Sequence, residues 1–157
     1  MHLENDPKNP CVGCGPLNPR GLQLKFEKVG EEVRSTLPVR PEWQGWPGLL
    51  HSGVLYIAML ETANWTVYGL KDRVGLPVGT SALELKRRTR VGDIVQLTGR
   101  HVASRTGPFI IEVTASDSGG SGLARLEREY EFPRRAEFVR RMGYGTLPAE
   151  LEEVVPP

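Results

Sequence analysis

The chain has 157 residues, a length that fits one domain with a core of its own. Its 20 Lys and Arg residues balance 19 Asp and Glu residues, which leaves a formal net charge of +1. This balance provides no electrostatic attraction to nucleic acid or to an anionic membrane, so neither is an expected partner. The first residues lack the basic and apolar segments of a signal peptide, and Cys11 and Cys14 are the only cysteines. We therefore expect a cytoplasmic protein without a disulfide framework.

Residues 1–20 are rich in Pro, Gly and Asn and predict a lead-in loop. Apolar side chains then alternate through residues 21–28, at Leu22, Leu24 and Phe26. After a turn at Gly30, alternation continues through residues 33–37, more weakly because Ser35 is polar. The two segments predict a pair of strands.

A long helix is predicted from Ser52 to about Tyr68, with Ser52 as the N-cap and Gly69 as the stop. Its apolar residues cover every side, so most of its faces must be buried. Polar residues, Glu61 among them, interrupt the apolar run, so the segment is predicted to be a buried core helix and not a membrane span.

Three or four strand segments follow, the first around residues 83–85 and ending at a turn at residues 91–93. The others cover residues 94–104, 109–115 and 123–132, separated by short Gly-bearing turns at residues 106–108 and 116–120. This spacing is typical of an antiparallel meander. A short helix (136–142) and an acidic tail (146–157) complete the chain.

The order of elements predicts an α+β fold in which an antiparallel sheet wraps around one long central helix. We expect this domain to cover residues 21–133, after the loop of residues 1–20 and before a C-terminal helix and tail at residues 134–157. The outer edges of one sheet need cover, so a homodimer with a continuous sheet is a further expectation.

Three motifs carry a resemblance to a known family. The run Cys11-Val-Gly-Cys-Gly-Pro-Leu-Asn-Pro-Arg-Gly-Leu22 resembles the CxxCGxxNPxGL opening of many bacterial hotdog thioesterases of the phenylacetate-pathway type. The run Glu42-Trp-Gln-Gly-Trp-Pro-Gly-Leu-Leu-His-Ser-Gly53 is similar to their loop that ends in PGxxHGG, and Val91-Gly92-Asp93 to a strand-to-strand turn. The similarity covers roughly residues 10–133.

The resemblance implies a hotdog fold, a dimer or dimer of dimers, and hydrolysis of acyl-CoA thioesters, with CoA as part of the substrate and no separate cofactor. In that family, backbone amides at the HGG start of the helix polarise the thioester carbonyl, a role that falls here on Ser52 and Gly53. A helix N-terminus has unpaired N–H groups and partial positive charge, so the chemistry fits the position. Gly53 would also let a ligand approach the backbone closely.

The acidic residue of the family motif is displaced in this chain. Nine residues after His51 stands Leu60, and the acid is Glu61, one position later and about 100° around the helix. Glu61 is a candidate general base or nucleophile, with a structural carboxylate as the alternative. It lies eight residues beyond Gly53, about 12 Å along the helix axis, so any cooperation between the two needs two chains.

The remaining candidate residues each have a structural alternative. His51 could act as a base or support the loop, and Asn64 could orient water or make a polar core contact. Candidate ligand-binding positions elsewhere are Gln44, Gly48, Thr80 and Ser81, the last two as hydroxyls that hold water. The guanidinium groups of Arg87, Arg88 and Arg90 could bind the phosphates of CoA or be a solvated strand end. Trp43, Trp46, Trp65 and Tyr56 could line an acyl pocket or pack in the core.

Cys11 and Cys14 have redox, zinc and structural interpretations. Zinc prefers four ligands, and only the two thiols with three scattered histidines are available by residue type. We expect loop packing and no metal site.

The leading hypothesis is therefore an acyl-CoA thioesterase. The alternatives are an acyl-CoA-binding protein that has lost the helix acid and, more weakly, a hydratase or dehydratase of the same fold.

Overall fold

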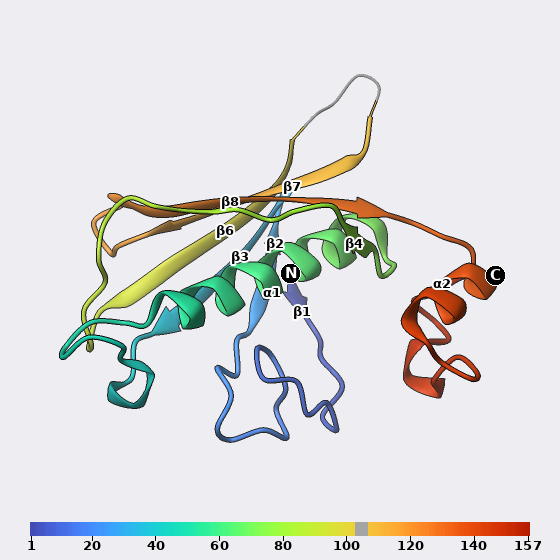
Figure 1. The fold of residues 1–157 in the computed structure, drawn as a ribbon, viewed down its shortest axis with the longest axis horizontal. Helices are drawn as coiled ribbons and strands as arrows, with labels where there is room; N and C mark the ends of the chain where they lie inside the picture. The colour runs from blue at the N-terminus through green and yellow to red at the C-terminus, as the bar shows by residue number, and fades with distance from the viewer. Residues whose placement is uncertain (103–106) are drawn as a thin grey trace.

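The computed structural model describes residues 1–102 and 107–157. Within them, a curved antiparallel sheet wraps around one long helix, as Figure 1 shows. The strands are β1 (His2–Leu3), β2 (Phe26–Val29), β3 (Glu32–Pro38), β4 (Leu76–Val78), β5 (Leu83–Leu85), β6 (Ile94–Val102), β7 (Phe109–Ser116) and β8 (Gly122–Glu131). The predicted α+β architecture with a central helix is confirmed.

The strand order across the sheet is β1-β2-β3-β6-β7-β8-β4, with β5 also paired to β8. Strands β6, β7 and β8 form the predicted antiparallel meander. Arg100 of β6 lies opposite Glu112 of β7, and Thr114 of β7 lies opposite Arg125 of β8. Strands β4 and β5 lie one after the other along β8, so residues 76–85 form one edge of the sheet. The predicted strand end at Ser104 and the predicted turn at Thr106 lie outside the described residues.

The central helix α1 runs from Ser52 to Lys71, three residues further than predicted. Gly69 does not end it, because this glycine is buried where a side chain would meet Val33 and Leu3. Asp72, in the left-handed conformation, ends the helix instead. Within the described residues, no helix combines the length and apolar character that crossing a bilayer requires.

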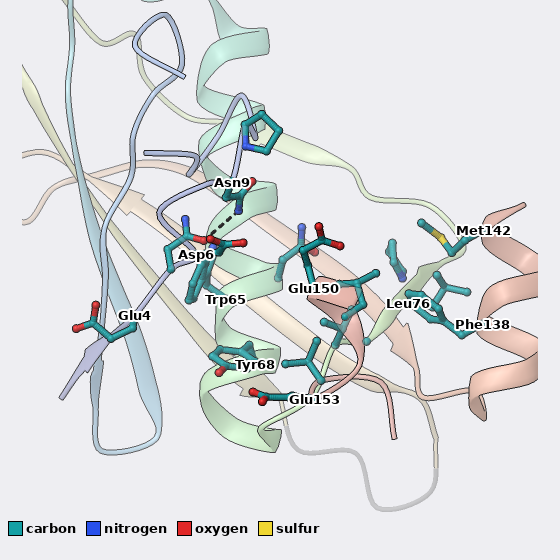
Figure 2. Close-up of a pocket in the computed structure, with 18 of the residues that line it drawn as sticks. Glu4, Asp6, Asn9, Trp65, Tyr68, Leu76, Phe138, Met142, Glu150 and Glu153 are labelled. Carbon is teal, nitrogen blue, oxygen red and sulfur yellow. Dashed lines mark hydrogen bonds between the residues drawn. The ribbon is translucent and has the colours of Figure 1, made fainter. Parts of the chain in front are cut away.

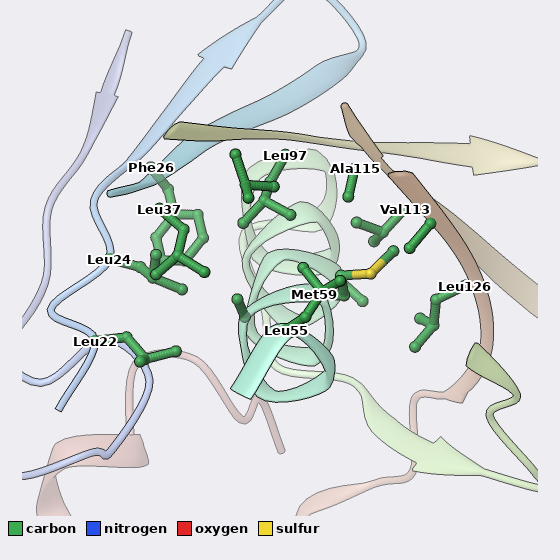
Figure 3. Close-up of a cluster of buried hydrophobic side chains, with 14 of the residues drawn as sticks. Leu22, Leu24, Phe26, Leu37, Leu55, Met59, Leu97, Val113, Ala115 and Leu126 are labelled. Atoms are coloured by element: carbon green, nitrogen blue, oxygen red, sulfur yellow. The ribbon is translucent and has the colours of Figure 1, made fainter. Parts of the chain in front are cut away.

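The core lies between α1 and the concave face of the sheet. Figure 3 looks along the helix, with Leu55 and Met59 facing side chains of the surrounding strands, among them Leu97 and Val113. The buried helix positions recur every three or four residues, as a helix packed along one side requires: Leu55, Ala58, Met59, Thr62, Ala63, Thr66, Val67 and Gly69. The hydroxyls of Thr62 and Thr66 donate to the carbonyls one turn earlier, which makes their burial possible.

Two parts of the fold near the N-terminus differ from the prediction. The predicted strand at residues 21–28 begins only at Phe26, because Gln23 adopts a positive φ of 50° and interrupts the extended chain. Leu22 and Leu24 are nevertheless buried in the core. The lead-in loop also contains a strand, since β1 pairs with β2.

The C-terminal segment forms a small cluster at the far end of α1. Helix α2 (Arg135–Met142) begins one residue before its predicted start, and a 3-10 turn, η2 (Ala149–Leu151), lies in the tail. Leu76 of β4, Phe138 and Val155 are buried together there. The C-terminal segment therefore packs against β4, a strand that the sequence analysis did not predict.

Candidate functional site

The loop before α1 is fixed by backbone hydrogen bonds on both sides. It begins with a 3-10 turn, η1 (Pro41–Trp43), whose Trp43 side chain is buried. The amide of His51 donates to the Trp43 carbonyl at 2.9 Å, and the amide of Leu50 donates to the Thr89 carbonyl at 2.9 Å. These bonds hold the start of the helix between the η1 turn and the segment that joins β5 to β6.

Gln44 and Gly48 shape the same loop. The Gly48 amide donates to Oε1 of Gln44 at 2.9 Å, and Gly48 adopts a φ of 75° that favours glycine. In the structure, these two residues are hydrogen-bonded to each other. The ligand-binding roles predicted for them remain predictions. Trp46, at the tip, is 80% exposed and lies outside the buried core.

His51 is the N-cap of α1, and the prediction that Ser52 caps the helix is wrong. The Nδ1 atom of His51 accepts a hydrogen bond from the Gly53 amide at 2.9 Å, and its carbonyl accepts from Val54 and Leu55. An imidazole nitrogen thus takes the place that a Ser, Thr, Asp or Asn oxygen usually has. This contact favours the structural interpretation of His51.

The cap changes which amide is available at the helix start. The Gly53 amide donates to His51, so it is not a free donor in this structure, and its predicted role toward the carbonyl stays a prediction. Ser52 is the first helical residue, and its amide has no hydrogen-bond partner among the described residues. The unpaired donor and the partial positive charge of the helix terminus therefore coincide at Ser52.

A groove opens at this amide. Its volume is about 320 Å³, and it is lined by Ser52, Gly53, Tyr56, Ser81 and Leu83. The Tyr56 hydroxyl donates to the Ser81 carbonyl at 2.8 Å, which ties the segment before β5 to the helix. The structure thus brings predicted Ser81 beside the helix start, whereas predicted Thr80 is exposed and does not line the groove.

Glu61 lies away from this groove, against the N-terminal loop. Any side chain at Gly13 would overlap its aliphatic carbons, so the Glu61 side chain occupies the space that this glycine leaves. Donor atoms of Cys11, Cys14 and Glu61 all lie within 4.8 Å of one another. Sequence reasoning treated these residues separately, because nothing in their spacing along the chain places the loop on this turn of α1.

The surroundings of the Cys14 thiol disfavour its ionised form. Burial raises the pKa of the Cys14 thiol above its ordinary range, and the nearby Glu61 carboxylate raises it further. The Trp65 side chain, hydrogen-bonded to the thiol, acts in the opposite direction. Glu61 makes no ion pair among the residues that the structure describes.

Asn64 lines a second, larger hollow at the other end of α1, with a volume of about 1250 Å³. Figure 2 shows Trp65 and Tyr68 of the helix on one side and Leu76, Phe138 and Met142 on the other. The Oδ1 atom of Asn64 accepts a hydrogen bond from the buried Tyr130 hydroxyl at 2.8 Å. Asn64 is itself exposed, so the bond joins a surface amide to a buried phenol and favours a structural role for Asn64.

The three predicted phosphate-binding arginines lie along the segment between β5 and β6. Arg87 pairs with Asp117 at 3.0 Å and also donates to the Gly122 carbonyl, so it supports the turn before β8. Arg88 and Arg90 are exposed. Within the described residues, none of these three arginines lines the groove at Ser52.

Strand order, the wrapped helix and the loop before it define a hotdog fold, which the chain shares with solved thioesterase-superfamily structures. No family model and no curated protein sequence matches the chain. A thioesterase superfamily protein has a TM-score of 0.67 at 19% identity over 74% of this chain, which spans 60% of that protein. The PaaI protein of the Escherichia coli phenylacetic acid degradation operon has a TM-score of 0.61 at 13% identity, with 70% and 83% covered.

A hypothetical thioesterase from Streptococcus pneumoniae, solved with coenzyme A, is also similar. Its TM-score is 0.59 at 17% identity, with 69% of this chain and 85% of that chain covered. At these identities the likeness establishes the fold, and the chemistry has to be argued from the residues of this chain.

Proposed function

We propose that this chain binds an acyl-CoA thioester at the start of α1 and hydrolyses it. The observation that carries the proposal is the unpaired amide of Ser52 at the N-terminus of a long buried helix, together with the groove that Ser52 lines beside Tyr56 and Ser81. A thioester carbonyl oxygen placed at this amide accepts its hydrogen bond. The hotdog fold and a similar protein solved with coenzyme A support the choice of ligand.

The reaction needs a donor at the position where negative charge develops. Water attacks the carbonyl carbon, the oxygen becomes an oxyanion, and the carbon–sulfur bond then breaks to release CoA thiol and a carboxylic acid. One such donor stabilises the transition state by about 3–4 kcal/mol. The Ser81 and Thr80 hydroxyls are the proposed groups that position the water, and the exposed Arg88 and Arg90 the proposed phosphate contacts.

A second copy of the chain is part of the proposal. Glu61 lies nine residues, about 13–14 Å, along the helix from the Ser52 amide of its own chain, too far for both to act on one carbonyl. A dimer that extends the sheet at the edge formed by residues 76–85 would bring a second helix alongside the first. Leu85 is an exposed apolar side chain at this edge, and a second chain paired there would cover it.

A non-catalytic acyl-CoA-binding protein is the second candidate. The observation that favours it is the position of the acid: Leu60 stands where the resembled family has its acid, and Glu61 is packed against Gly13 beside the two thiols. A carboxylate held there is not free to activate water in the groove at Ser52. This candidate keeps the carbonyl-binding amide and lacks turnover.

A panel of acyl-CoA esters of increasing chain length separates the two candidates. Hydrolysis is followed by loss of the thioester, and binding by the shift in thermal unfolding temperature. Turnover supports the thioesterase, whereas thermal stabilisation without turnover supports the binding protein. Neither turnover nor stabilisation with any ester rejects both.

The role of Glu61 is tested by Glu61→Gln, with Glu31→Gln in the exposed turn between β2 and β3 as the matched control. If Glu61 is the base, Glu61→Gln abolishes turnover and preserves binding, while Glu31→Gln retains both. Equal turnover in the two variants would exclude Glu61 as the base.

A further inference from the structure

The thiols of Cys11 and Cys14 and the carboxylate of Glu61 form a cluster that the proposed thioester chemistry does not use as a unit. The three donor atoms come from two distant parts of the chain, the N-terminal loop and the middle of α1, and lie within 4.8 Å of one another. Cys14 is buried, and Cys11 and Glu61 are half-buried. Such a meeting of soft and anionic donors is the first requirement of a metal site.

The loop that holds the two cysteines is built tightly around the first sulfur. The Gly13 amide donates to Sγ of Cys11 at 3.3 Å, and the Gly15 amide donates to the Cys11 carbonyl at 3.0 Å. A side chain at Gly15 would overlap the backbone of Cys11, so the turn requires glycine there.

The second cysteine has polar contacts of its own. Nδ2 of Asn9 lies 3.8 Å from Sγ of Cys14, and Oδ1 of Asn9 accepts from the Cys11 amide at 2.9 Å. Asn9 thus links both cysteines, as outer contacts that orient ligands do in metal sites.

Charge gives the second argument. A carboxylate and a buried thiol lie side by side, and Glu61 has no ion-pair partner within the described part of the chain. A divalent cation bound between them would replace the thiol protons and balance the negative charge of the ligands. The Glu61 side chain fills the space over Gly13, so its carboxylate is directed into the loop.

We propose that Cys11 Sγ, Cys14 Sγ and a Glu61 carboxylate oxygen bind a thiophilic divalent metal ion, with Zn²⁺ as the best match and water as the fourth ligand. Zinc takes tetrahedral sets of thiolate and carboxylate at distances of about 2.3 Å to sulfur and 2.0–2.2 Å to oxygen. The proposal departs from the expectation of no metal, because Glu61 supplies a ligand that the cysteine spacing alone does not reveal. The ion would fasten the N-terminal loop to the central helix, and this role does not depend on the proposed thioester chemistry.

The test uses the full chain, zinc or cobalt(II) chloride, and no acyl substrate. We expect one zinc per chain by elemental analysis after dialysis, and a thiolate-to-cobalt charge-transfer absorption on cobalt substitution. Glu61→Gln is expected to weaken zinc binding roughly tenfold or more in a chelator competition, with Glu31→Gln as the unchanged control. Cys14→Ser is expected to abolish the charge-transfer band contributed by that sulfur and to weaken binding further.

A variant that keeps all three ligands gives an independent check. Gly13→Ala places a methyl group where the Glu61 side chain lies, so it displaces that side chain and weakens zinc binding. The matched control is Gly145→Ala, where a side chain meets open space. Circular dichroism of each variant confirms that the fold persists.

Three results would overturn the proposal. The first is less than stoichiometric zinc in protein purified with zinc present. The second is zinc binding by Glu61→Gln that equals the control. The third is an absence of free thiols in metal-free, unreduced protein, which would identify a Cys11–Cys14 disulfide instead.

Discussion

The Nδ1 atom of His51 accepts a hydrogen bond from the Gly53 amide at 2.9 Å, and this contact decides which amide of the helix start stays free. Gly53 is the residue that a sequence motif marks as the carbonyl donor, yet its N–H is already paired. The next amide toward the N-terminus, that of Ser52, has no partner among the described residues. The histidine therefore caps the helix and shifts the site by one residue.

Replacing His51 by alanine removes this cap. We expect His51→Ala to lower the free energy of unfolding by about 1 kcal/mol, the usual loss when a capping side chain is deleted. His51→Asn supplies another acceptor and should retain most of the stability. Urea denaturation of the three proteins measures the difference, and equal stability of the alanine and asparagine variants would exclude the capping role.

The edge formed by β4 and β5 is the proposed site of self-association. Leu85→Lys places a charge on this edge and should shift the protein toward monomer, measured as molar mass in solution by light scattering. Val29→Lys is the matched control, because Val29 is as exposed as Leu85, at 39%, and lies on β2 at the other side of the sheet. Dissociation by both substitutions, or by neither, would argue against pairing at this edge.

Close contact between α1 and β6 makes Gly99 sensitive to any side chain. A methyl group there would overlap the hydroxyl of Thr66, which itself donates to the Thr62 carbonyl at 2.6 Å. We expect Gly99→Ala to cost about 1–3 kcal/mol of stability, as overpacking does in a dense core. Thermal and urea unfolding measure it, with Gly145→Ala as the control, and a neutral Gly99→Ala would mean that helix and sheet are further apart than described.

Glu112 of β7 gives the stability a predictable pH dependence. Burial raises the pKa of this carboxyl group, but hydrogen bonds from Arg100 and Arg125 outweigh the burial, so the pKa lies below its ordinary value of 4.5. A carboxyl group whose pKa is depressed on folding stabilises the folded state above its unfolded pKa and loses this contribution as the pH falls through the folded pKa. The stabilisation is therefore complete at neutral pH and is lost in acid.

Glu112→Gln should accordingly cost about 1–2 kcal/mol at neutral pH, a value kept low because both arginine side chains are partly exposed. The difference from the wild type should shrink below about pH 4.5. Glu127→Gln removes an exposed partner of Arg125 and serves as the control with a smaller effect. A Glu112→Gln cost that is the same at pH 3 and pH 7 would contradict the assignment.

The large features of the fold could be predicted from residue patterns. The all-round apolar segment from Ser52 predicted the buried helix, and turns at Gly92 and at residues 116–120 predicted the meander of β6, β7 and β8. Gly69 misled the placement of the helix end, because a glycine that ends a helix and one that allows close packing look alike in a sequence. Strand β4 was missed because Pro77 argues against a strand, although an edge position tolerates it.

The site was less predictable than the fold. Residue type favours Ser52 over His51 as a cap, and only the direction of the imidazole ring shows that the histidine accepts the bond. The cluster of Cys11, Cys14 and Glu61 depends on how the N-terminal loop folds over α1. No local pattern fixes that packing, so the carboxylate next to the CxxC pair could not have been found from its spacing.

The central claim is that the Ser52 amide receives the thioester carbonyl, and replacing Ser52 by proline tests it most directly. Proline is well tolerated at the first helical position and removes this N–H alone, while His51 already has the extended conformation that a residue before proline requires. For the acyl-CoA that is hydrolysed fastest, we predict that kcat/KM falls by about 100–1000-fold in Ser52→Pro and stays near the wild-type value in Ser52→Ala, which retains the amide. Wild-type kcat/KM in a correctly folded Ser52→Pro protein would contradict the claim.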